Sequence, residues 1–238
     1  MLSALALVLA LTACDVALNV GTIPPSTPAP IATATAPLPS PEQAARTFGQ
    51  VVQAVVPVAT RECNRRTRGI NCDFLITIDP DRNAPPNAYQ SLDETGRPVL
   101  TFTAALIASI RNPDEMAFVM GHEASHHIAN HLARQSAYAA AGAEAFGTLA
   151  TLTGGGARDV AAARELGAAV GARSYSKEFE LEADRLGTII TYKAGFDPLV
   201  GAAFFTRIPD PGDQFLGSHP PNAQRLEAVR RTVRAIGG

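Results

Sequence analysis

The chain has 238 residues, of which 46% are hydrophobic, and its 20 basic and 22 acidic residues leave a formal net charge of −2. This composition excludes an intrinsically disordered chain, and the balanced charge gives no indication of a nucleic-acid partner. About 195 residues follow a biased N-terminal stretch, which is enough for one domain with a substantial hydrophobic core. We therefore expect a single folded domain over residues 42–238.

The N-terminal segment is typical of a targeting signal followed by a linker. Residues 1–13 form an apolar run that is too short to span a membrane but suits the core of a signal peptide. The run ends at Leu11-Thr12-Ala13-Cys14, which resembles a bacterial lipobox, where the cysteine is acylated and becomes the mature N-terminus. Residues 14–41 are rich in Pro, Ala, Thr and Ser, as in a semi-extended tether. We predict a lipoprotein signal peptide over 1–13 and a lipid-anchored tether over 14–41; an unmodified disordered tail is the alternative.

Two cysteines and two β-rich segments come next. Cys63 and Cys72 remain once Cys14 is assigned to the anchor, and an even number of cysteines in an oxidising compartment predicts a disulfide. A strand is predicted at 74–78, and the alternating run 98–103 is rich in β-branched and aromatic residues. That run can offer an exposed edge to which an extended substrate adds, or it can be an interior strand. The sequence does not rank these two interpretations.

The segment that starts at Asn112 has the signals of a buried helix. Asn112 is a favourable N-cap, and Pro113 suits the first helical position. Apolar residues recur as far as Leu132. We expect one continuous, largely buried helix over Pro113–Tyr138.

This predicted helix carries His122-Glu123-Ala124-Ser125-His126, a pattern for which the composition gives about 0.005 chance occurrences. Histidines four residues apart lie on one face of a helix, so His122 and His126 can bind the same metal ion. Glu123 is offset from that pair and can act as the general base toward a water molecule whose pKa the metal lowers. His127 and His131 point off this face, and isolated histidines are more often structural or solvated.

Two further helical regions follow. Residues 135–175 are rich in Ala and Gly and predict two helices joined by a loop, which act either as a mobile lid or as simple helical packing. The acidic segment 176–187 predicts a second active-site helix. Within it Glu180 and Asp184 lie four residues apart. One carboxylate can therefore complete a three-ligand zinc site while the other accepts the free ring N–H of a ligand histidine.

Three separated motifs together resemble peptidase family M48. They are HExxH at 122–126, Glu180-Leu181-Glu182-Ala183-Asp184, and Ser218-His219-Pro220-Pro221 followed by Arg225. Smaller similarities at 87–89, 98–103 and 194–198 extend the resemblance over about Phe74 to Arg225. The resemblance implies an α+β fold: a mainly helical, zincin-like metallopeptidase domain with a small β-sheet next to the HExxH helix. It also implies Glu180 as the third zinc ligand, Asp184 as the residue that orients a ligand histidine, and solvated or structural roles for Glu178 and Glu182.

His219 lies before two prolines that cannot continue a helix, so its position is rigid. As a donor it can stabilise the oxyanion of the tetrahedral intermediate, and as a neutral ring it can occupy the fourth position on zinc. Both roles depend mostly on the resemblance, and the residues leave the choice open. Arg225 is interpreted as a structural charge partner.

The leading hypothesis is a zinc-dependent endopeptidase with one Zn²⁺ per chain, bound by His122, His126 and Glu180, and with Glu123 activating water. The resemblance implies polypeptide substrates, in particular misfolded or unassembled cell-envelope proteins. The lipobox places the protein on the periplasmic side of a bacterial envelope, held to a membrane through a lipid anchor. A chaperone-like adaptor with structural zinc and a structural lipoprotein are the alternatives. The sequence gives neither the oligomeric state nor the choice between inner and outer membrane.

Overall fold

The computed structural model describes residues 38–212, 217 and 219–237. These residues belong to residues 35–238, the second of two compact units into which the chain divides. The predicted signal peptide, Cys14 and the tether as far as residue 37 lie outside the described residues, as does Ser218.

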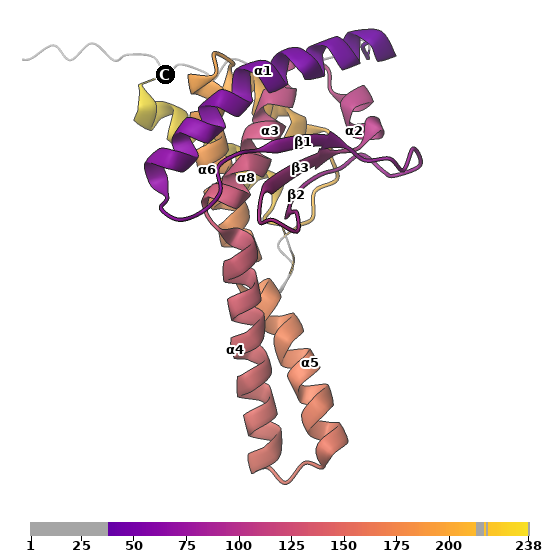
Figure 1. The fold of residues 1–238 in the computed structure, drawn as a ribbon, viewed down its shortest axis with the longest axis vertical. Helices are drawn as coiled ribbons and strands as arrows, with labels where there is room; N and C mark the ends of the chain where they lie inside the picture. Colours follow the sequence, from indigo (N-terminus) through magenta and orange to yellow (C-terminus); the bar gives the residue numbers. More distant parts are fainter. Residues whose placement is uncertain (1–37, 213–216, 218, 238) are drawn as a thin grey trace, which may run out of the picture. The chain divides into compact units, whose positions relative to one another are not determined.

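The described residues form helices around a small sheet, which confirms the predicted, mainly helical α+β fold (Figure 1). The elements in chain order are α1 (Pro41–Arg66), β1 (Leu75–Ile78), β2 (Ala88–Leu92), β3 (Pro98–Phe102), α2 (Ala104–Ser109), α3 (Pro113–Ile128), α4 (His131–Leu152), α5 (Ala157–Ser174), α6 (Ser176–Lys193), α7 (Pro198–Ala202), the 3-10 helix η1 (Ala203–Thr206) and α8 (Asn222–Ile236).

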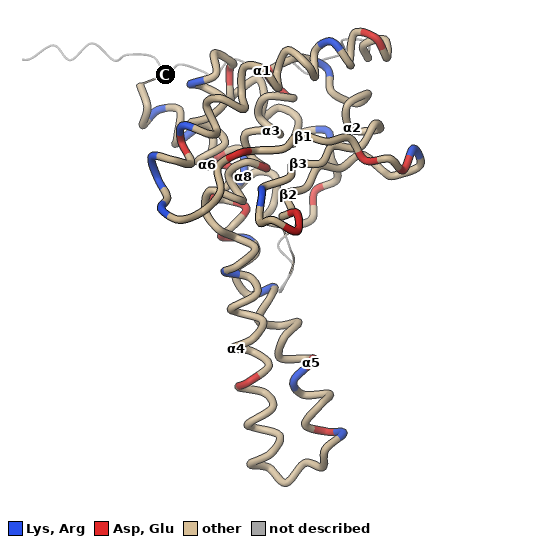
Figure 2. The backbone as a smooth tube through the Cα atoms, in the orientation of Figure 1, with Lys and Arg blue, Asp and Glu red and all other residues tan. Residues whose placement is uncertain are grey.

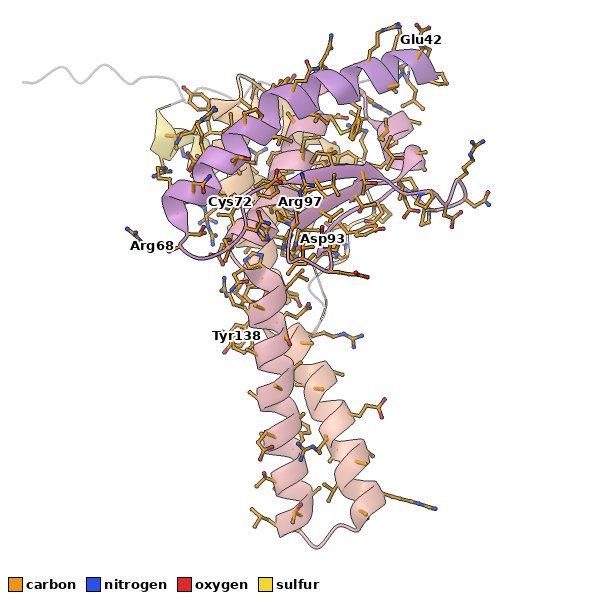
Figure 3. The ribbon with its side chains drawn as sticks, viewed as in Figure 1. Glu42, Arg68, Cys72, Asp93, Arg97 and Tyr138 are labelled. Carbon is orange, nitrogen blue, oxygen red and sulfur yellow. A yellow bond between two sulfur atoms is a disulfide. The ribbon has the colours of Figure 1, made fainter. Side chains whose placement is uncertain are left out.

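Helix α1 starts at Pro41, the last residue of the predicted tether. Ser40 and Gln43 form a capping box there, and Pro41 occupies the first turn. One face of α1 is fully buried at Val51 and Val55 and joins the main hydrophobic core. The sheet, α2, α3 and α6 contribute the rest of that core. A disulfide joins Cys63, near the end of α1, to Cys72 in the segment before β1, and Cys72 is labelled in Figure 3.

The sheet has the strand order β1-β3-β2, with β1 parallel and β2 antiparallel to β3. Segment 98–103 therefore forms the central strand, and the idea that it offers a free edge for substrate is wrong. Its buried residues explain this position, since Leu100 and Phe102 are almost completely enclosed. Among the described residues, β1 and β2 are the two edge strands, and each has one edge without a strand neighbour.

Helices α3 and α6 pack closely because glycines face one another where they meet. A Cβ atom on Gly187 would lie 3.0 Å from the backbone nitrogen of His122, and one on Gly121 would lie 3.1 Å from the carbonyl oxygen of Gly187. Side chains there would separate the two helix backbones. The close approach brings the HExxH segment of α3 against the acidic segment of α6.

The predicted helix over 113–138 begins as expected, because the side chain of Asn112 accepts a hydrogen bond from the backbone N–H of Glu115. Its predicted continuity is wrong, however, since α3 ends at Ile128 and α4 starts at His131. Asn130 between them has a left-handed backbone with φ 55°. Asparagine tolerates this conformation better than most residues do. The break redirects the chain just after the HExxH motif.

Helices α4 and α5 form the predicted pair of helices and lie side by side, extending away from the other helices (Figure 1). Their backbones touch at small residues: a Cβ atom on Gly142 would lie 2.1 Å from the carbonyl oxygen of Gly167. Charged residues are sparse along α4, where Arg134 and Glu144 are the charged side chains, and are more frequent on α5 (Figure 2). Within the described part of the chain, no helix combines the length and apolarity needed to cross a membrane.

Candidate metal centre

Three predicted metal ligands meet where α3 faces α6. The Nε2 atoms of His122 and His126 lie 3.0 Å apart. The carboxylate of Glu180 reaches both rings, with Oε1 3.3 Å from His126 Nε2 and Oε2 3.5 Å from His122 Nε2. Among the described residues, these three form the group of His, Cys, Asp and Glu side chains that can hold a metal ion.

The spacing of these atoms suits a small tetrahedral cation. With ligand bonds of about 2.1 Å, two corners of a tetrahedral zinc site lie about 3.4 Å apart. The two ring nitrogens are 3.0 Å apart, and each lies near this distance from one oxygen of Glu180: Oε1 is 3.3 Å from His126 and Oε2 is 3.5 Å from His122. Two imidazoles and one carboxylate are also a donor set that zinc accepts in catalytic sites, with one position left for water or substrate.

Glu180 brings a buried carboxylate against the two histidine rings. Its Oε2 atom is buried and meets no donor in strict hydrogen-bond geometry among the described residues, although the guanidinium of Arg225 lies 3.3 Å and His219 Nδ1 3.1 Å away. Burial alone would raise the pKa of this carboxyl, but the neighbouring rings of His122, His126 and His219 hold it well below its usual value. A buried, ionised carboxylate oxygen without a hydrogen bond is costly unless a cation neutralises it. Arg225 supplies one positive charge near this oxygen, and the donor set of two imidazoles and one carboxylate is what fits a metal ion.

Asp184 contacts the ring of His122 and is itself bound by Arg225. Asp184 is fully buried, and its Oδ1 atom lies 3.0 Å from His122 Nδ1. Arg225 binds Asp184 through two hydrogen bonds of 2.7 and 2.8 Å, and its guanidinium lies 3.9 Å from the ring centre of Phe205. Asp184 thus fixes the orientation of the His122 ring, with Nε2 turned toward Glu180.

The protonation of His122 reflects the negative charge of this site. Burial by itself would lower the pKa of His122, but its hydrogen bonds to Asp184 and Glu180 raise it to about 10. The two carboxylates thus favour positive charge at this ring. A metal ion bound at Nε2 would replace that positive charge.

Glu123 lines the same cleft. The cleft has a volume of about 940 Å³ and is lined by His122, Glu123, His126, Glu180, His219, Arg225 and residues of β2, α4 and η1, among others. Glu123 is largely buried yet faces this space, and it follows His122 on α3 without entering the group of three ligands. This position separates a carboxylate from the metal-binding atoms, as the motif predicts.

His219 lies at the open side of the group. Its Nδ1 atom is 3.1 Å from Glu180 Oε2, while its side chain remains 53% exposed. His219 is not part of the compact group of three ligands. It contacts the site through Oε2 of Glu180, the oxygen that Arg225 also approaches.

The other two histidines differ from each other. His127 turns away from the site, as predicted, and its Nε2 atom lies 2.6 Å from the carbonyl oxygen of Asn71 in the segment closed by the disulfide. The prediction that His131 points away from the site is wrong, since its Nδ1 atom lies 2.9 Å from His126 Nδ1. The helix break at Asn130 is the reason, and a break at an Asn within an apolar periodic segment leaves only a weak sequence signal.

Of the two roles expected for Glu182, solvated or structural, the contacts favour the structural one. Its Oε2 atom lies 3.2 Å from His131 Nε2 and 2.8 Å from Arg134. Burial would raise the pKa of Glu182, but the hydrogen bonds from Arg134 and His131 lower it. His131 is buried, which with the neighbouring His126 lowers its pKa to about 4. The ring is therefore neutral near pH 7.

Comparisons with known proteins agree with this arrangement. A family model described as peptidase family M48 matches residues 50–233, which include all the residues of the candidate site. The chain is also 34% identical over 127 residues to the "Putative beta-barrel assembly-enhancing protease" of Vibrio cholerae serotype O1. The aligned region is 50% of this chain but only 25% of that protein, so most of the relative has no counterpart in the alignment.

Proposed function

The chain belongs to peptidase family M48 and is a metallopeptidase, and we propose that it is a zinc-dependent endopeptidase that cleaves polypeptides in extended conformation. One observation carries this proposal. Two imidazole nitrogens and a carboxylate from two helices offer ligand atoms that all lie within 4.8 Å of one another, and Glu123 lines the same cleft.

In this proposal His122, His126 and Glu180 would hold the zinc ion. Zinc would supply the Lewis acidity that polarises a peptide carbonyl and makes water acidic. Glu123 takes a proton from the attacking water and delivers it to the leaving amine nitrogen. Asp184 keeps the His122 ring in place during this process. His219, at the exposed side of Glu180, donates a hydrogen bond to the oxygen that gains negative charge.

The free edge of β2 is the proposed substrate platform. In an antiparallel pair, every second residue turns its backbone N–H and C=O toward the neighbouring strand. Asn87 and Asp93 do so, because the carbonyl of Asn87 accepts from the N–H of Thr103 and the N–H of Asp93 donates to Arg97. The alternate residues Ala88 and Gln90 therefore turn their backbone groups outward. Both residues also line the cleft that contains Glu123. An extended peptide can add to this edge by backbone hydrogen bonds, which favours unfolded chains over a particular sequence.

The proposed setting is the bacterial cell envelope, with misfolded or unassembled envelope proteins as substrates. Two observations support it: the name of the Vibrio cholerae relative, and the lipobox-like segment that ends at Cys14. We propose that Cys14 is lipidated and that the Pro-rich segment tethers the peptidase to a membrane on its periplasmic side.

The test is cleavage of an unfolded protein such as casein by the purified chain, with the zinc content measured on the same samples. We expect about one zinc per chain in the wild type and in Glu123→Gln, and cleavage in the wild type only. Glu178→Gln is the matched control, since Glu178 is exposed on α6 and lies outside the cleft. Equal cleavage by wild type and Glu123→Gln would overturn the proposed mechanism, and zinc binding without any cleavage would support an adaptor instead.

A further inference from the structure

His131 contacts His126 although the two residues are five apart in the sequence. In a continuous helix such residues are about 140° apart around the axis and do not meet. The left-handed backbone at Asn130 ends α3 and lets the first residue of α4 turn back toward the site. The contact joins the Nδ1 atoms of the two rings at 2.9 Å.

The direction of the hydrogen bonds follows from the metal-binding atom. His126 presents Nε2 to His122 and Glu180, so this nitrogen must be without a proton when it binds a metal. The proton of the neutral ring is then on Nδ1, which donates to His131 Nδ1. The proton of His131 is in turn on Nε2, which donates to Glu182 Oε2 at 3.2 Å.

The far end of this chain of hydrogen bonds is held in place. His131 is only 4% exposed, and its ring stacks on Phe179 with centroids 4.5 Å apart and an angle of 12° between the planes. Arg134 binds the same oxygen of Glu182 at 2.8 Å. These contacts leave the His131 ring little freedom to rotate away from His126.

We propose that His131 is the positioning residue for the ligand His126 and that, together with Glu182, it links that ligand to a carboxylate. The inference rests on the proposed function, in which His126 binds zinc. Each ligand histidine then has a carboxylate behind it: Asp184 directly for His122, and Glu182 through His131 for His126.

Such partners hold the ligand ring in one orientation and make its metal-binding nitrogen more basic. Removing them typically weakens metal binding by about 10- to 100-fold. His131→Leu removes the acceptor, whereas His131→Asn places an amide oxygen near the position of Nδ1. Glu182→Gln removes only the charge at the far end, and the side chain of Glu182 is 41% exposed, so this change is not expected to unfold the protein.

The experiment measures the zinc affinity of the metal-free chain by competition with a chromophoric chelator, and the visible spectrum of the Co²⁺-loaded protein. We expect His131→Leu to bind zinc about 10- to 100-fold more weakly and to shift the Co²⁺ bands, with most of the affinity restored in His131→Asn. Glu182→Gln should lose several-fold in affinity, while the control Glu178→Gln matches the wild type. If His131→Leu does not fold, the zinc affinities of Glu182→Gln and Glu178→Gln are compared, and equal affinities would overturn the inference.

Wild-type zinc affinity and Co²⁺ bands in both His131→Leu and Glu182→Gln would overturn the inference while leaving the peptidase proposal intact. Equal weakening by His131→Leu and His131→Asn, with Glu182→Gln unchanged, would also overturn it, because the effect would then be one of packing. A wild-type chain that binds no zinc would overturn the proposed function and this inference together.

Discussion

Glu62 forms an ion cluster that joins α1 to α6, the helix that carries Glu180. Its buried carboxylate contacts Arg65 and Arg66 on its own helix and lies 2.6 Å from the ammonium group of Lys193 at the end of α6. Burial would raise the pKa of Glu62, but the hydrogen bonds from Lys193, Arg65 and Arg66 lower it from 4.5 to about 2. We predict that Glu62→Gln destabilises the fold at pH 7 and much less in acid.

The size of the effect follows from this pKa. A carboxyl whose pKa falls from 4.5 to about 2 on folding adds about 3 kcal/mol to the free energy of unfolding at neutral pH. The side chains of Arg65 and Lys193 are 58% and 46% exposed, so solvent screens part of this attraction. We therefore expect a loss of about 2 kcal/mol for Glu62→Gln at pH 7.

The sign of the pH dependence is fixed by the lowered pKa. The contribution is fully present above the unfolded pKa of about 4.5 and is lost as the pH falls toward the folded pKa of about 2. Urea unfolding of wild type and Glu62→Gln should therefore differ at pH 7 and converge between pH 4.5 and 2. Glu42→Gln is the control, because Glu42 is exposed and pairs only with exposed Arg46 among the described residues. A difference that stays constant down to pH 3, or a loss below about 0.5 kcal/mol at pH 7, would refute the reasoning.

Two other changes test the site itself. His219→Ala should reduce kcat by about 100- to 1000-fold if His219 stabilises the oxyanion, with the zinc affinity unchanged; a parallel loss of zinc in equilibrium dialysis would identify it as a ligand instead. Gly187→Ala places a Cβ atom 3.0 Å from the backbone of His122, so we expect about 1–3 kcal/mol of destabilisation in urea unfolding and weaker zinc binding. Gly49→Ala, where a Cβ atom meets no other atom within 4 Å, is its control, and equal behaviour of the two variants would contradict the close-packing argument.

Several features could be predicted because they depend on local sequence. Four-residue spacing on a helix brings His122 and His126 together whatever surrounds them, and the N-cap signals at Asn112 define where that helix starts. The even number of cysteines left after Cys14 predicted the pairing that the structure shows between Cys63 and Cys72.

Other features could not be predicted because they depend on contacts between distant segments. An alternating pattern shows that residues 98–103 form a strand, but it does not show whether that strand has a neighbour on both sides. The structure places β1 and β2 on either side of it, and the free edge next to the cleft thus belongs to β2. The role of Glu182 was likewise hidden, since its partner His131 is 51 residues away.

The sequence by itself determined the candidate site: the pair His122 and His126, the adjacent carboxylate of Glu123 and the acidic helix that faces them. These follow from helical periodicity and from the few residue types that bind zinc. Only the tertiary structure decided how the ligands are held. The close contact of Gly121 with Gly187 sets the distance between the two helices, and the left-handed turn at Asn130 brings His131 against His126. Both depend on backbone geometry that side-chain patterns do not encode.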